Sequence, residues 1–143
     1  MAPAAKLHLD GDLLAISTDG GSRGNPGPAA AGYVIGGLAF GKYVGETTNN
    51  DAEYQGVVFA LDKARRLLGK TKAKQTRVEV RMDSELAVKQ LNHEYRIKDP
   101  VLQQHFITIW NLMLDFKEVS FIHVRREFNK AADAAVNKVL DAR

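Results

Sequence analysis

The feature that most constrains the fold is the order in which strand-like and helix-like segments follow one another. Three segments with the short apolar runs of β-strands stand close together before residue 48, and helical and strand-like segments alternate after it. This order, βββαβαβα, predicts an α/β protein with a five-stranded mixed sheet flanked by helices. We expect strands at 12–19, 29–37, 38–47, 76–83 and 118–124, and helices at 50–69, 84–92, 99–116 and 129–142.

Composition narrows the class of protein. The chain has 143 residues, of which 45% are hydrophobic, so we expect a single domain over 1–143. It contains no cysteine, which excludes disulfides and thiolate metal sites. It also has neither the apolar core of a signal peptide near its start nor the run of ~18 apolar residues that a membrane span needs. We therefore expect a monomeric, cytoplasmic protein that does not contact a membrane.

Charge is mildly basic, with a formal net charge of +3. This balance fits a polyanionic partner such as a nucleic acid but does not require one. The basic stretch GKTKAKQTR, residues 69–77, lies between two periodic segments, and we expect it to be a solvated loop. No Walker or dinucleotide fingerprint occurs in the glycine-rich stretch GGSRGNPGP, residues 20–28, which therefore suits backbone approach to a sugar–phosphate chain better.

Two of the predicted strands end in an aspartate, at Asp19 and at Asp83. If these strands are parallel neighbours, both carboxylates lie at the carboxyl edge of the sheet, where open α/β sheets bind ligands. Glu53 and Asp133 fall in the first turns of helices, which can begin at the same edge. Four converging carboxylates would raise one another's pKa, and a divalent cation would relieve that repulsion. All-oxygen ligands favour Mg²⁺ or Mn²⁺.

Each acidic residue also has a simpler explanation. Asp19 could start a turn before a glycine, and Asp83 could cap the helix that begins near residue 84. Glu53 could complete a capping box with Asn50, and Asp133 could stabilise a helix by its interaction with the helix dipole. Taken singly, these explanations are at least as good as a metal site, so the prediction depends on the four residues converging.

Four stretches in this order and spacing, TDGGSRGNPGP, TTNNDAE, DSELAVKQL and NKAAD, resemble the ribonuclease HI family. The resemblance covers about residues 13–140 and implies the ribonuclease H-like fold, in agreement with the predicted sheet. Longer members of the family insert a basic protrusion near residues 92–105, where this chain has Arg96 and Lys98 as its only arginine and lysine. The chain therefore resembles a short form without that protrusion.

The resemblance implies an endoribonuclease that cuts the RNA strand of RNA–DNA hybrids with two Mg²⁺ ions, for which Mn²⁺ substitutes, and leaves 5′-phosphate and 3′-hydroxyl ends. Double-stranded RNA stays open as a further substrate, and the alternative function is a non-catalytic RNA- or hybrid-binding module on the same fold. By motif, the metal-binding and catalytic residues are Asp19, Glu53, Asp83 and Asp133. The implied substrate-binding residues are Gly20, Gly21, Ser22, Asn25, Thr48, Asn49, Asn50 and Glu85.

The segment before Asp133 departs from the pattern of many relatives, which carry a histidine there. We expect Arg126 to serve as the catalytic-site cation, with a plain phosphate contact or a solvated loop charge as the alternatives, and His123 to be a packed residue of the last strand. Glu85 replaces a glutamine of some members, and Glu46 replaces an arginine that some members place in a phosphate pocket. We expect Trp110 to lie in the core with Phe106 and Met113, and the remaining histidines, His8, His93 and His105, to be surface residues.

Overall fold

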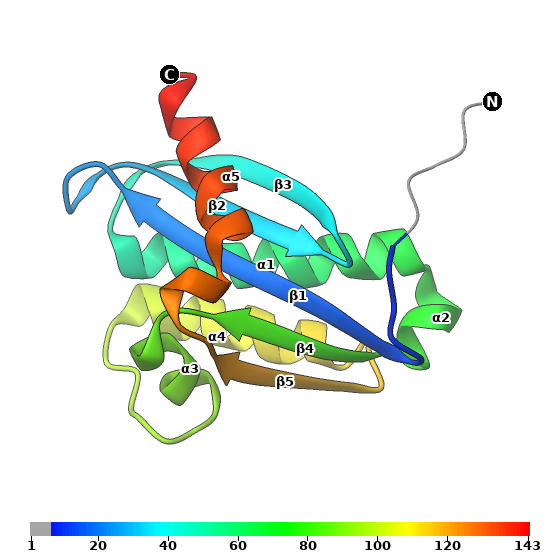
Figure 1. Ribbon diagram of the computed structural model, residues 1–143. Helices are drawn as coiled ribbons and strands as arrows, with labels where there is room; N and C mark the ends of the chain where they lie inside the picture. The colour runs from blue at the N-terminus through cyan, green and yellow to red at the C-terminus, as the bar shows by residue number, and fades with distance from the viewer. Residues whose placement is uncertain (1–6) are drawn as a thin grey trace.

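The computed structural model describes residues 7–143. Its centre is a five-stranded sheet in the order β3-β2-β1-β4-β5 (Figure 1). β1 pairs with β2 and β2 with β3 in antiparallel fashion, whereas β1–β4 and β4–β5 are parallel. The strands are β1 Leu13–Ser22, β2 Gly27–Ile35, β3 Leu38–Thr47, β4 Arg77–Met82 and β5 Glu118–His123. The mixed five-stranded α/β sheet expected from the sequence is confirmed.

Helices cover both faces of this sheet. α1 and α4 pack behind it in the view of Figure 1, while α5 crosses in front of β1, β2 and β3. The helices are α1 Asn49–Leu68, α2 Lys70–Lys74, α3 Glu85–Leu91, α4 Pro100–Met113 and α5 Lys130–Asp141, with a 3₁₀ turn at Arg126–Phe128. No helix within residues 7–143 is both long enough and apolar enough to cross a membrane.

Alternation along β1 creates a core on each side of the sheet. Leu14 and Ile16 are fully buried on the α1 side, where they join the main hydrophobic cluster with Val57 and Leu61. The other face of the sheet forms a smaller cluster under α5, centred on Ala30, Val136 and Leu140. Because successive strand residues face opposite sides, Asp19 shares the α5-facing side of β1 with Gly21.

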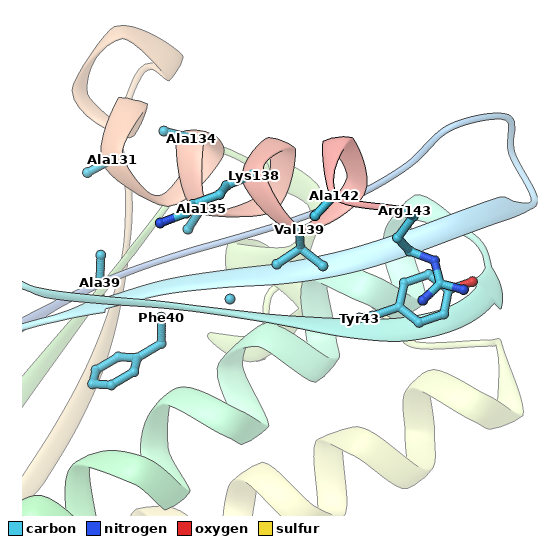
Figure 2. Close-up of a pocket in the computed structure, with 11 residues that line it drawn as sticks. Ala39, Phe40, Tyr43, Ala131, Ala134, Ala135, Lys138, Val139, Ala142 and Arg143 are labelled. Atoms are coloured by element: carbon cyan, nitrogen blue, oxygen red, sulfur yellow. The ribbon is translucent and has the colours of Figure 1, made fainter.

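Missing side chains let α5 lie close to the sheet. A β-carbon on Gly32 would be 2.3 Å from the carbonyl oxygen of Ala132, and one on Gly41 would be 2.6 Å from Val139 Cγ2. Farther along, a groove of about 690 Å³ opens between α5 and the edge strand β3, and Arg143 lies over the Tyr43 ring at 3.5 Å from its centre (Figure 2). Small residues therefore fix the path of the helix that carries Asp133.

Several expectations about local structure need correction. The segment 69–77 is not a solvated loop: it contains α2, its Ala73 and Thr76 are buried, and Thr76 Oγ1 donates a 2.7 Å hydrogen bond to Lys72 O. β1 continues three residues beyond Asp19, and α2 is an additional helix between α1 and β4, whereas the two helices expected between β4 and β5 are both present.

Trp110 is not in the core. Its exposed fraction is 58%, whereas that of the neighbouring Ile109 is 1%. The buried stripe of α4 runs through Leu102 and Ile109, with Phe106 and Met113 half-buried beside it. One position corresponds to about 100° around a helix, which turns the Trp110 side chain away from the buried side of α4.

Candidate active site

The first two carboxylates are brought together by parallel pairing of β1 and β4. Thr18 pairs with Met82 in the register of these strands, so Asp19 and Asp83 follow side by side at the carboxyl edge. Asp19 is still within β1, opposite Gly32 of β2, and its Oδ1 accepts a 2.9 Å hydrogen bond from Gly20 N–H. It is therefore held by the sheet and does not start a turn.

Helix caps do not account for Glu53 or Asp83. Thr48 is the N-cap of α1, and its hydroxyl accepts a hydrogen bond from Asp51 N–H at 3.2 Å. Ser84 caps α3 in the same way, accepting from Ala87 N–H at 3.2 Å. The capping explanations of these two acids are wrong, because Thr48 and Ser84 make the caps instead. Both carboxylates therefore remain free to bind a ligand. Asp133 does lie in the first turn of α5, as expected.

All four acidic side chains line one cavity of about 280 Å³ at this edge of the sheet. Its walls come from the end of β1, the start of α1, the residue after β4, the 3₁₀ turn and one side of α5. The lining residues expected from the sequence are Asp19, Gly20, Gly21, Ser22, Asn49, Glu53, Asp83, Arg126 and Asp133. Convergence, on which the prediction depended, is thus present.

Burial and mutual repulsion dominate the electrostatics of the cavity. Burial, followed by the Asp83 carboxylate, raises the pKa of Asp19 from 3.8 to about 8, although the Gly20 hydrogen bond opposes the shift. Burial likewise raises the pKa of Glu53 to about 7, partly offset by Ser84 and Arg126. Oε2 of Glu53 is buried and has no hydrogen-bond partner. The protein alone therefore does not supply a hydrogen-bond partner for every carboxyl oxygen of this cavity.

These properties fit a divalent metal ion. The donors are all carboxylate oxygens, which Mg²⁺ and Mn²⁺ prefer, and a cation would satisfy the unpartnered oxygen of Glu53. Within residues 7–143, no three acidic, histidine or cysteine side chains lie close enough together to form a complete metal cage.

Hydrogen bonds tie the glycine-rich turn to the start of α1. Asn49 Oδ1 accepts from both the backbone N–H and the hydroxyl of Ser22, at 2.8 and 3.0 Å. In return, Asn49 N–H donates to Asn25 Oδ1 at 3.0 Å. Three of the expected substrate-binding residues therefore form one rigid unit beside the carboxylates.

Four of the expected substrate-binding residues do not line the cavity. Thr48 and Asn50 are exposed at the start of α1, and together with Asn25 and Glu85 they lie outside the cavity lining. Glu85 begins α3 and forms an ion pair with Lys89 at 3.2 Å.

Arg126 and His123 differ in their relation to the site. Arg126 lines the cavity, and its Nε lies 4.0 Å from Asp83 Oδ2, while 91% of its side chain is exposed. His123 is the last residue of β5 and is exposed, so the expectation that it packs in the strand is wrong. Arg126 is the cation that the structure brings next to Asp83.

His105 is not a free surface residue. Its Nε2 lies 2.6 Å from Asp51 Oδ1, which links α4 to the first turn of α1. Asp51 also accepts hydrogen bonds from Thr47 and Gln55, both at 2.8 Å. Burial acts to raise the pKa of Asp51, but these hydrogen bonds outweigh it and the net shift is downward. The network steadies the helical turn that carries Glu53.

Two residues of the cavity lining were missed from the sequence, and so was one contact that holds α5 in place. Asn129 is the N-cap residue of α5 but makes no side-chain cap; its buried Nδ2 donates to Thr18 O at 2.9 Å and fastens α5 to β1. Arg23 and Asn137 line the cavity. Asn137 Nδ2 donates to Asp133 Oδ2 at 3.3 Å, a contact that the spacing of four residues on a helix could have indicated.

A five-stranded mixed sheet with four acidic side chains converging at its carboxyl edge defines a ribonuclease H-like protein. A family model described as reverse transcriptase-like matches residues 17–139. LC11-RNase H1, solved in complex with an RNA/DNA hybrid, superposes with a TM-score of 0.84 at 40% identity, covering 90% of this chain and 97% of that one. The chain belongs to the ribonuclease HI family.

Two curated relatives are longer than this chain. Ribonuclease HI of Halobacterium salinarum is 39% identical over 129 residues, which cover 86% of this chain and 62% of the relative. A bifunctional protein of Mycobacterium tuberculosis is 38% identical over 136 residues, which cover 90% of this chain and 36% of the relative. The chain thus spans less than two thirds of the length of either relative.

Proposed function

We propose that the chain is an endoribonuclease that hydrolyses the RNA strand of RNA–DNA hybrids and leaves 5′-phosphate and 3′-hydroxyl ends. The observation that carries this proposal is the convergence of Asp19, Glu53, Asp83 and Asp133 in one cavity. The Ser22–Asn49–Asn25 unit beside it supplies backbone and amide groups next to the carboxylates. The hybrid bound by LC11-RNase H1 supports the choice of substrate.

The four carboxylates would hold Mg²⁺, as two ions, with Mn²⁺ as the substitute. Two bound ions would supply activation of the attacking water and neutralisation of charge on the leaving 3′ oxygen. The protein's own part is to keep the acidic oxygens converging: the sheet fixes Asp19 and Asp83, the cap at Thr48 fixes the turn that carries Glu53, and Asn137 orients Asp133.

Arg126 would act by charge. A guanidinium does not lose its proton near neutral pH, so it cannot be the general base. Its position near Asp83 suits attraction of the negatively charged substrate or product at the mouth of the cavity. The exposed position means that water screens this attraction, so the effect of Arg126 on turnover should be moderate.

A non-catalytic binding module on the same fold is the alternative. A surface that only binds a polyanion gains affinity from cations, whereas a cluster of buried acids opposes that binding. The raised pKa values of Asp19 and Glu53 reflect the cost of keeping this cluster. The acidic cavity therefore favours catalysis over binding alone.

A panel of duplexes tests the proposal. Purified protein and Mg²⁺ are incubated with end-labelled RNA–DNA, RNA–RNA and DNA–DNA duplexes, and the products are mapped. We expect internal cuts in the RNA of the hybrid and none in DNA–DNA; cuts in RNA–RNA would add double-stranded RNA as a substrate. Binding of the hybrid without any cleavage would support the binding module instead.

We also propose that the protein is monomeric, which light scattering measures, and that it is located in the cytoplasm.

A further inference from the structure

Two rows of side chains run alongside each other from the carboxylate cavity toward the end of α5. Asp19 and Gly21 lie on the same side of β1, where two residues advance about 6.6 Å, and Arg23 follows just beyond the end of the strand. Asp133, Asn137 and Asp141 recur every four residues on α5, where four residues advance about 6 Å. The steps along the two rows are nearly equal in length, and the rows meet at their far ends, where Arg23 contacts Asp141.

Contacts within and between the rows confirm this arrangement. A β-carbon on Gly21 would lie 3.6 Å from Val136 of α5, so β1 and α5 are in contact at that step. At the far end, the Arg23 guanidinium donates to the carboxylate of Asp141. Arg23 N–H also donates to Pro28 O at 2.9 Å, so the hairpin pairing holds its backbone beyond the end of β1.

Arg23 is one of two cations, with Arg126, among the described residues that line the cavity. Arg126 stands beside Asp83, whereas Arg23 contacts Asp141, which lies eight residues, or about 12 Å, along α5 from Asp133. The distance between Arg23 and the carboxylates is too long for one phosphate to contact both. A nucleic-acid strand with one phosphate at the carboxylates would therefore bring a different phosphate to Arg23.

The contribution of its ion pair with Asp141 to folding stability does not account for the position of Arg23 at the cavity. Half of the Arg23 side chain and 68% of the Asp141 side chain are exposed, and ion pairs this open to water add little to stability. The pair does restrict the guanidinium to the cavity side of the turn while leaving donors free. Guanidinium donors match phosphate oxygens in a two-point contact.

We propose that Arg23 binds a phosphate of the strand being cut, near the scissile position but not at it, and that Asp141 positions the guanidinium before substrate arrives. This inference rests on the proposed function. Arg23 extends the acidic cavity into a longer track for the RNA strand, and Asp141 is a positioning residue that touches no substrate.

Salt dependence of hybrid binding tests the proposal, because each phosphate contact contributes to the slope of log K against log salt. Binding is measured with the Asp83→Asn protein in Mg²⁺, so that the hybrid stays uncut. Adding Arg23→Gln should make the slope shallower by about 0.7–0.9. Adding Asp141→Asn removes the same ion pair but keeps the cation, and should leave the slope unchanged.

Arg66→Gln is the control for net charge. Arg66 is an exposed arginine paired with Asp62 at the far end of α1, about 20 Å from Glu53 along the helix axis, and its loss should not change the slope. In protein with Asp83 intact, Arg23→Gln should raise KM several-fold with kcat unchanged. Melting temperatures of all variants should match, since the affected side chains are largely exposed.

The outcomes separate the two proposals. Equal losses of affinity in Arg23→Gln and Asp141→Asn, without a change of slope, would make the ion pair structural and overturn the role of Arg23. If the Asp83→Asn protein binds no hybrid at any salt concentration, the proposed function fails as well. An uncharged methylphosphonate beside the cleavage site in the RNA strand should erase the effect of Arg23→Gln; erasure by the same change in the DNA strand would refute the assignment to the cut strand.

Discussion

Replacing Gly20 by alanine tests how β1 and α1 together set the site. The alanine β-carbon would lie 2.3 Å from the carbonyl carbon of Ala52 and 2.3 Å from the nitrogen of Glu53. Ordinary contacts begin near 3.4 Å, so the start of α1 must retreat by about 1 Å. Overpacking costs about 1–3 kcal/mol, and we expect the upper end because both obstacles are backbone atoms.

The predicted change is large enough to measure in two ways. For a domain of this size, about 3 kcal/mol corresponds to a fall in Tm of roughly 6–12 °C. The same retreat carries Glu53 away from Asp19, and a misplacement of about 1 Å can lower turnover about 100-fold. Calorimetry and hybrid cleavage under saturating Mg²⁺ give the two readouts.

Gly21→Ala is the matched control for stability. Its β-carbon would meet Val136 Cγ1 at 3.6 Å, an ordinary contact, so Tm should stay within a few degrees of the parent protein. If Gly20→Ala melts like Gly21→Ala and retains full turnover, the close packing of β1 on α1 does not set the position of Glu53, and our account of the site geometry is wrong.

Three further predictions follow from particular side chains. The unfolded chain releases the Asp19 proton near pH 4 but the folded, metal-free protein holds it to about pH 8, so stability should fall by up to a few kcal/mol as pH rises between these values; Asp19→Asn should flatten the fall in thermal melts recorded in chelator. Ile109→Ala should cost about 2–5 kcal/mol in denaturant unfolding, whereas Trp110→Ala should cost less than about 1 kcal/mol, and the reverse order would restore Trp110 to the core. Arg126→Ala should lower kcat about tenfold, which is less than loss of a buried donor would cause, and should change KM less than kcat. His123→Ala should leave kcat, KM and Tm near the parent values. Loss of turnover in the His123 variant alone would reverse the assignment.

Much of the structure at the carboxyl edge of the sheet could be predicted, because each strand and helix there has a recognisable sequence pattern of its own. Strand alternation and the helix signals fixed the identity of most elements, and the strand at 38–47 has the predicted bounds. Parallel pairing of β1 and β4 then brings Asp19 and Asp83 together without any knowledge of side-chain packing. The four carboxylates were therefore found by topology together with family resemblance.

Burial of single side chains was harder to predict, because it depends on how a helix is rotated against its neighbours. The apolar stripe of α4 is wide enough to include Trp110, yet the helix turns Ile109 inward instead. His105 pairs with Asp51 of a different helix, 54 residues away in sequence, and local pattern carries no signal of that contact. Asn129 similarly satisfies the backbone of β1 rather than its own helix, which only the tertiary structure shows.

The central claim is that the four converging carboxylates make a metal site that cuts RNA in a hybrid. The most direct measurement is single-turnover cleavage of an end-labelled hybrid by the parent protein and by Asp83→Asn, each titrated with Mg²⁺ from a chelated start. We predict no cleavage in excess chelator, cleavage that rises with Mg²⁺ in the parent protein to give 5′-phosphate and 3′-hydroxyl ends, and none in the folded Asp83→Asn protein. Undiminished cleavage in chelator, or equal rates in the two proteins, would contradict the account.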